Sequence, residues 1–114
     1  MPGRTVIFLS HSDEAALRAA GSCALAAVSL EDRVDVFLLG PAVPALVAAH
    51  EGEPDEPAAL LHQARGLGAR LVACSASVVA EKVDLGAAGE ALDAVVGWPT
   101  ILEWSRGVVD RFSF

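Results

Sequence analysis

The chain has 114 residues, of which 54% are hydrophobic and 20% charged, and its formal net charge is −7. This length matches a single domain spanning residues 1–114, because a chain of this size buries roughly two-thirds of its unfolded surface. The acidic balance and the lack of a Lys/Arg cluster argue against nucleic acid and anionic membranes as partners, since both would be repelled.

The sequence also lacks the signals of membrane insertion and export. No apolar run reaches the roughly 18 to 20 residues that a spanning helix needs. Residues 1–4 lead directly into an apolar run of strand length, without the longer apolar region and cleavage site of a secretory signal. We therefore expect a cytoplasmic protein in which Cys23 and Cys74 remain free thiols.

Residues 3–73 alternate between short apolar runs and helical patterns. The predicted elements are, in chain order, a strand at 5–9, a helix from Ser12 or Asp13 to about Ser29, a strand at 34–39, a short helix from Pro41 to about Ala49, a helix from Ala58 to about Leu67, and a strand at 69–73. The acidic tract at 50–57 breaks regular structure between the two predicted helices at 41–49 and 58–67, and a solvated loop is its preferred interpretation over a lid.

The remainder of the chain is less regular. We predict a short helix at 74–80, a strand at 93–96, a helix at 99–105 and a strand at 108–114, and we leave the Gly/Ala-rich connection at 85–91 unassigned. The alternation of strands and helices predicts an α/β fold, in which an open, mainly parallel five-stranded sheet of flavodoxin-like topology carries helices on both faces.

In such sheets, ligands bind beyond the carboxyl ends of the strands. The residue pairs that leave the predicted strands there are Ser10-His11, Gly40-Pro41, Cys74-Ser75 and Gly97-Trp98. A thiol at a helix N-terminus is favoured as a thiolate by the positive end of the dipole, so Cys74 is the candidate reactive residue. The plain alternative is that Cys74 is a small buried side chain at the end of a strand.

Four neighbouring residues are candidate substrate-binding groups. Ser75 and Ser77 could donate hydrogen bonds to a thiolate or a bound sulfur, or could cap the helix. His11 could act as a base or a cation near the thiol, or could be an ordinary loop residue. Trp98 could roof a pocket or serve in packing. Cys23, inside an Ala-rich helix, is interpreted as a core or interface residue.

Metals and cofactors are not predicted. The three histidines His11, His50 and His62 are scattered, and neither cysteine has a CxxC or Cys/His spacing, so no metal-ligand pattern is present. No GxGxxG or GxxxxGK[ST] pattern follows any strand, so no phosphate-binding loop is expected. This weakens a third alternative, a flavodoxin-like domain that binds a nucleotide or a flavin.

Residues 68–77, with the letters GARLVACSAS, resemble a segment of the DsrE/DsrF-like sulfur-relay family, in which a strand ends in a sulfur-accepting cysteine at the start of a helix. The resemblance covers most of the chain. It includes the opening strand with its Ala-rich helix, the strand at 34–39 followed by a glycine, and the ending from Val96-Gly97 through a helix to 108–114.

The resemblance implies the fold of that family, assembly into trimers or hexamers, and Cys74 as the position that carries a persulfide. The chain departs from the family pattern in three places. The loop after Ser10 is short and bears a histidine, the 51–57 tract is unusually acidic, and Lys-Val-Asp-Leu at 82–85 replaces a glycine-led segment.

The leading hypothesis is a sulfur-relay protein that carries a persulfide on Cys74 and exchanges sulfur with donor and acceptor proteins. The alternative, from a different class, is a non-catalytic, oligomeric small-ligand-binding or assembly module of the same fold. Ala-rich helices favour this alternative as well, because small residues allow subunits to pack closely.

Overall fold

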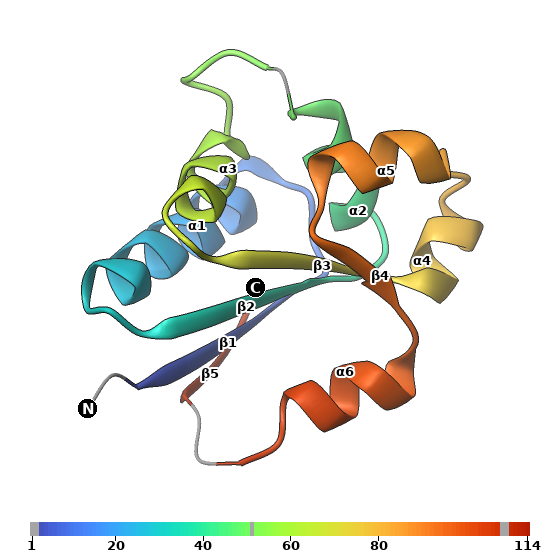
Figure 1. Ribbon diagram of the computed structural model, residues 1–114. Coiled ribbons are helices and arrows are strands. Elements are labelled where there is room, and N and C mark those ends of the chain that lie inside the picture. Colours follow the sequence, from blue (N-terminus) through green and yellow to red (C-terminus); the bar gives the residue numbers. More distant parts are fainter. Residues whose placement is uncertain (1–2, 51, 108–109) are drawn as a thin grey trace.

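A computed structural model describes residues 3–50, 52–107 and 110–114 of the chain. Its centre is one five-stranded sheet, in which every pair of neighbouring strands is parallel (Figure 1). The strands are β1 (Arg4–Leu9), β2 (Arg33–Leu38), β3 (Arg70–Cys74), β4 (Ala94–Val96) and β5 (Asp110–Ser113), and their order across the sheet is β4-β3-β2-β1-β5. The predicted open parallel α/β fold is confirmed.

Six helices connect the strands in the described part of the chain. They are α1 (Glu14–Ser29), α2 (Ala42–Ala48), α3 (Ala59–Gly66), α4 (Ser75–Ala80), α5 (Leu85–Ala91) and α6 (Trp98–Trp104). None of these helices is both long enough and apolar enough to cross a membrane.

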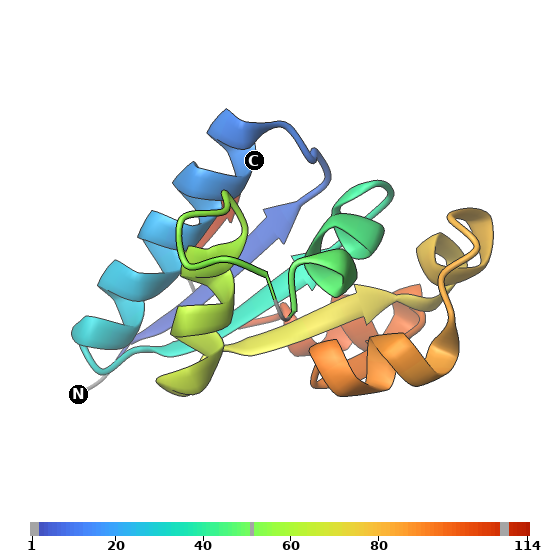
Figure 2. The same cartoon turned by 90° about the horizontal axis from the view of Figure 1, so that it is seen from above.

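The strand order explains how the helices are shared between the two faces. The chain steps in one direction from β1 to β4, and right-handed crossovers in one direction place their helices on one face. Viewed from above, α1, α3, α2 and α5 cover this face (Figure 2). The connection from β4 to β5 runs back across the sheet, and of the helices in the described ranges only α6 lies on the opposite face (Figure 1).

The predicted flavodoxin-like topology is wrong in its detail. Flavodoxin-like sheets have the order 2-1-3-4-5, whereas this sheet has the order 4-3-2-1-5. The two orders first differ at β3, which pairs with β2 here but lies next to β1 in the flavodoxin-like order. As a result β2, β3 and β4 all lie on one side of β1, and β5 lies on the other side. Helices do lie on both faces as predicted, but they are divided unequally.

The core is correspondingly divided into two apolar clusters. The larger cluster lies under α1, α2, α3 and α5 and includes fully buried Ile7, Leu38 and Leu61. The smaller cluster lies on the α6 side and consists of Val6, Phe37, Val72, Cys74 and Ile101. The candidate thiol is therefore part of the smaller cluster.

Close contact between α1 and α3 depends on a glycine in α1. A Cβ atom at Gly21 would lie 2.5 Å from Cβ of Leu60, which is shorter than real side chains tolerate. We expect Gly21→Ala to lower the free energy of unfolding by about 1 to 3 kcal/mol, because the two helices must separate. Gly89→Ala is the matched control, since nothing lies within 4 Å of a Cβ at that position. Urea unfolding measures both, and an unchanged Gly21→Ala variant would contradict this contact.

Most element boundaries agree with the prediction to within two residues. The unassigned 85–91 segment is a helix, α5, which begins after Asp84, whose carboxylate accepts a hydrogen bond from the Ala87 N–H at 2.9 Å. The predicted strand at 108–114 is described only from Asp110, because residues 108 and 109 lie outside the described ranges. Within 50–57, the described residues contain no helix or strand, as predicted, and Glu51 lies outside the described ranges.

Candidate functional site

The carboxyl ends of the strands meet at one edge of the sheet, as predicted from the parallel arrangement. The Ser77 Oγ accepts a hydrogen bond from the Gly40 N–H at 2.8 Å, which ties the loop after β2 to α4. A Cβ atom built at Gly97 would lie 3.7 Å from the Ser75 Oγ, so the exits of β3 and β4 also touch. Cys74-Ser75, Gly40 and Gly97-Trp98 therefore lie together.

A crevice is expected where neighbouring strands send their connections to opposite faces of a sheet, and ligands of open α/β proteins bind there. In this fold the pair is β3 and β4, because β3 leads into α4 and α5, whereas β4 leads into α6 on the other face (Figure 1). Cys74 is the last residue of β3, and Trp98 is the first residue of the helix after β4. The candidate site is at this position.

The thiol itself points into the protein. Cys74 is 1% exposed and packs on the α6 side with Phe37, Val72 and Ile101. It is the N-cap residue of α4, but its side chain makes no capping hydrogen bond. The predicted position at a helix start is confirmed, whereas the expected contact between the sulfur and the helix N–H groups is not made in this conformation.

Helix α6 packs against the thiol through Ile101. Its Ile101 is fully buried against the cluster that contains Cys74, while Trp98 at its start is 45% exposed. Among the described helices, α6 is the only one on this face of the sheet (Figure 1). Because α6 has only seven residues, we expect its displacement to expose the thiol.

The four predicted substrate-binding residues have different positions. Ser75 lies beside Gly97 at the exit of β4, and Ser77 accepts the hydrogen bond from Gly40. Trp98 follows Gly97 and is half exposed, so it does not form a closed roof. His11 is exposed beside β1, and its Nδ1 is 3.3 Å from the Ser10 Oγ. Because β1 is two strands from β3, about 10 Å separates the two exits, so His11 is not placed beside Cys74.

Cys23 lies on the opposite face, half-buried on α1, and both cysteines are free thiols. Burial raises the pKa of the Cys23 thiol, so this side chain stays protonated at neutral pH. A protonated thiol is a poor nucleophile. This agrees with its interpretation as a core or interface residue.

A hollow of about 370 Å³ that no sequence pattern indicates lies beside α3. It is lined by His50, His62, Arg65, Gly66 and Asp93. Its charged residues have structural partners. Arg65 donates to Asp93 at 3.2 Å and to the Ala91 carbonyl at 2.9 Å, and Asp93 accepts from the Leu71 N–H at 2.8 Å. These bonds hold α3, α5 and β3 together. No sequence spacing links the two histidines, because a long loop separates them.

His62 gives the fold a pH dependence. Its Nε2 donates to the Leu46 carbonyl at 2.8 Å. Burial lowers the pKa of His62 below its usual 6.5, and nearby His50 and Arg65 act in the same direction, against the hydrogen bond to Leu46. Below about pH 6.5 the unfolded chain takes up the proton first, so the free energy of unfolding falls until the pH has passed the lowered pKa.

We expect native protein to lose stability between pH 7 and pH 5, and His62→Gln to show a smaller loss over this interval. His11→Gln, at an exposed histidine, is the control and should keep the native pH dependence. Urea unfolding at the two pH values measures the difference. An equal loss in His62→Gln and native protein would contradict the role of His62.

A second feature that the sequence did not reveal is a buried carboxylate on the α6 side. Asp35 is 1% exposed, and its Oδ1 accepts from Arg70 Nε at 2.7 Å, while its Oδ2 lies 3.5 Å from Arg4 Nη2. The Arg70 guanidinium stacks 4.1 Å from the centre of the Trp104 ring. Arg4 also donates to the Arg106 carbonyl at 2.9 Å, just beyond α6. This cluster anchors the end of α6.

Within residues 3–50, 52–107 and 110–114, no group of three or more His, Cys, Asp or Glu side chains is arranged to hold a metal ion. Comparison of the chain with protein-family models gives no match, and comparison with curated proteins gives none.

Proposed function

We propose that this chain is a sulfur-relay protein of the DsrE/DsrF-like kind, which carries a persulfide on Cys74. The observation that supports the proposal is the position of this cysteine, at the carboxyl end of β3 next to the exit of β4. Open α/β sheets bind their ligands where two neighbouring strands send their connections to opposite faces, as β3 and β4 do. Cys23 has no comparable position, because it lies in the middle of α1.

The proposed reaction needs no cofactor and no external oxidant. The Cys74 thiolate attacks the terminal sulfur of a donor persulfide R–S–SH, so a new S–S bond forms and the bond to the donor sulfur breaks. The donor leaves as the thiol RSH, and Cys74 becomes Cys74–S–SH. An acceptor thiolate R′–S⁻ then attacks the same terminal sulfur, which yields R′–S–SH and restores Cys74.

Access to the sulfur requires α6 to move, because Cys74 is buried against Ile101. We expect the start of α6 to move away from the sheet first, because its first residue is not buried. Trp98 is half exposed, and the Ser75 Oγ lies 3.7 Å from where a Cβ atom at Gly97 would be, next to the start of α6. With the helix displaced, the exposed start of α4 and the hydroxyl of Ser75 become available to the anion. The partner proteins supply the donor and acceptor thiols.

Thiol labelling of the folded protein tests this access. We expect iodoacetamide to modify Cys74 under native conditions faster than global unfolding allows, since local opening of one helix costs less than unfolding. In Cys23→Ser, labelling by iodoacetamide reports on Cys74 alone. In Cys74→Ser, it reports on Cys23 alone. If Cys74 reacts only when the whole protein unfolds, the sulfur-relay proposal fails.

The burial of Cys74 favours a second candidate, a non-catalytic small-ligand-binding or assembly module. In that case the thiol contributes only packing, and Cys74→Ser alters stability or subunit assembly without changing any sulfur chemistry. Assembly into trimers or hexamers, which the family resemblance implies, is compatible with both candidates. Sedimentation of native protein and of Cys74→Ser, beside a sulfur-loading assay, separates them.

A further inference from the structure

The outer edge of the sheet is formed by β5, whose four residues are all exposed. The Phe114 N–H donates to the Phe8 carbonyl at 2.8 Å, and the Phe114 carbonyl accepts from the Ser10 N–H at 3.0 Å. Successive residues of a strand turn their backbone N–H and C=O groups to opposite sides of the strand. The backbone groups of Phe112, two residues before Phe114, therefore also face β1. The backbone N–H and C=O groups of Arg111 and Ser113 therefore face outward, on a strand edge that has no neighbour in the described chain.

An apolar groove of about 210 Å³ runs beside this edge, between α1 and β5. Its lining includes Cys23 and Ala27 of α1, Leu30 at the end of α1, and Phe112 of β5. Leu30 is 74% exposed and Phe112 is 44% exposed. Residues 19–30 contain no charged side chain, although part of this helix surface faces solvent. An open strand edge thus lies next to an uncovered apolar surface, the combination that marks an interaction site.

We propose that β5 pairs antiparallel with β5 of a second copy of this chain, about a two-fold axis that passes beside Phe112. In this register Arg111 lies opposite Ser113 of the second copy, and Ser113 lies opposite Arg111. Both residues turn their backbone groups outward, so each pair exchanges two hydrogen bonds. The two sheets become one continuous sheet, and neither copy keeps an open edge at β5.

The strand's own side chains select this register. Phe112 is in register with Ile7 on the α1 side, whereas Arg111 is in register with Val6 on the α6 side. A shift by one residue would set the α1 face of one copy against the α6 face of the other. Two-fold registers centred on Asp110 or on Arg111 would set like charges directly opposite each other, which is destabilising.

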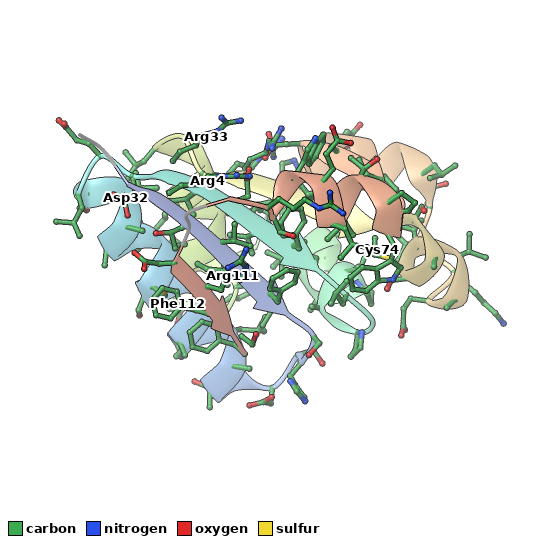
Figure 3. The ribbon with its side chains drawn as sticks, turned by 90° about the horizontal axis from the view of Figure 1, so that it is seen from below. Arg4, Asp32, Arg33, Cys74, Arg111 and Phe112 are labelled. Atoms are coloured by element: carbon green, nitrogen blue, oxygen red, sulfur yellow. The ribbon has the colours of Figure 1, made fainter. Side chains whose placement is uncertain are left out.

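Centring the axis on Phe112 avoids this repulsion and covers the groove. The two Phe112 side chains then face each other at a non-hydrogen-bonded position, where opposite Cα atoms are only about 4.5 Å apart. Aromatic cross-strand pairs stabilise such positions. Each ring also extends over the groove of its own copy, which Phe112 lines. Figure 3 shows Phe112 and Arg111 on this outer strand, far from Cys74. The contact is therefore independent of the proposed sulfur chemistry.

Disulfide cross-linking tests the register. In a Cys23→Ser background, we expect Phe112→Cys to form a covalent dimer with oxidised glutathione, because its Cα separation lies within the range of roughly 4.4–6.8 Å that disulfides span. Asp110→Cys is the matched control on the same face of the same strand. In the proposed register, position 110 of one copy lies opposite position 114 of the other. The two cysteines at position 110 are then separated by four residues along the strand, roughly 14 Å at 3.4 Å per residue, and should not cross-link. Equal cross-linking of both variants, or of neither, overturns the proposal.

A proline substitution tests the pairing without touching the fold. The Ser113 N–H faces outward, so Ser113→Pro removes no hydrogen bond within one copy, and edge strands tolerate proline at such positions. We expect it to halve the mass of the native assembly in sedimentation equilibrium, while Ser113→Ala leaves the mass unchanged and circular dichroism shows that both variants are folded. A hexamer with two-fold axes is compatible with this contact, whereas a trimer without two-fold axes is not. A native monomer or trimer, or a Ser113→Pro variant of native mass, overturns the proposal.

Discussion

Replacing Ile101 by alanine is expected to destabilise the fold and to expose Cys74 at the same time. Ile101 is fully buried and joins α6 to the cluster that contains Cys74. Removing its buried carbons lowers the free energy of unfolding by about 3 kcal/mol, because the residues around the cavity can fill it only in part. Much of this loss falls on α6 itself, so the helix opens more often. We expect native-state labelling of Cys74 to accelerate about tenfold or more, since about 1.4 kcal/mol is worth a factor of ten.

Leu102→Ala is the matched control for this prediction. Leu102 is the next residue of the same helix but is 53% exposed, so its removal leaves no cavity and should change the free energy of unfolding by less than about 0.5 kcal/mol. Urea unfolding and iodoacetamide labelling measure the two variants side by side. Destabilisation of Ile101→Ala without faster labelling of Cys74 would contradict the view that α6 controls access to the thiol.

Asp35→Asn is expected to cause a loss of similar size by a different mechanism. The carboxylate of Asp35 is buried between Arg70 at 2.7 Å and Arg4 at 3.5 Å. Breaking a buried ion pair by removing one partner costs 3 to 5 kcal/mol in general. The side chains of Arg4 and Arg70 are 25% and 33% exposed, so both can partly turn to water, and we expect a loss of about 2 to 3 kcal/mol.

Glu14→Gln serves as the comparison for the loss of a charge at the surface. Glu14 pairs with Arg18 at 2.8 Å, four residues along α1, and both side chains are largely exposed. Such pairs contribute about 0.3 to 0.5 kcal/mol, so Glu14→Gln should be nearly neutral. Urea unfolding at low and high salt measures both variants. A small effect of Asp35→Asn, similar to that of Glu14→Gln, would contradict a structural role for the buried carboxylate.

Much of the architecture could be predicted because the local signals are strong. The apolar run at 5–9 is long enough and β-branched enough to indicate a strand covered on both faces. Asp13, one of the two predicted caps, accepts from the Ala16 N–H at 3.2 Å at the start of α1. The position of the candidate site followed from the parallel arrangement alone, since such strands all end at the same edge.

The features that could not be predicted depend on tertiary structure. Gly86 and Gly89 weaken the helical pattern of α5, which forms because Asp84 caps it and because Ala88 and Ala91 pack into the core. The apolar pattern of α6 does not reveal which face of the sheet it covers, because this depends on where β5 is added. Burial of Cys74 at the end of its strand was one of the two interpretations that the sequence left open, and Cys74 is buried. Its packing against Ile101 and the ion pairs of Asp35 could not be predicted, because they depend on which face α6 covers and on how distant strands pair.

Intact-protein mass spectrometry after incubation with a low-molecular-weight persulfide tests the central claim most directly. The native chain, Cys74→Ser and Cys23→Ser are compared before and after reduction. We expect native protein and Cys23→Ser to gain one sulfur atom that dithiothreitol removes, and Cys74→Ser to gain none. Native protein that gains no sulfur, or that gains it equally in Cys74→Ser, would contradict the assignment of Cys74 as a persulfide carrier.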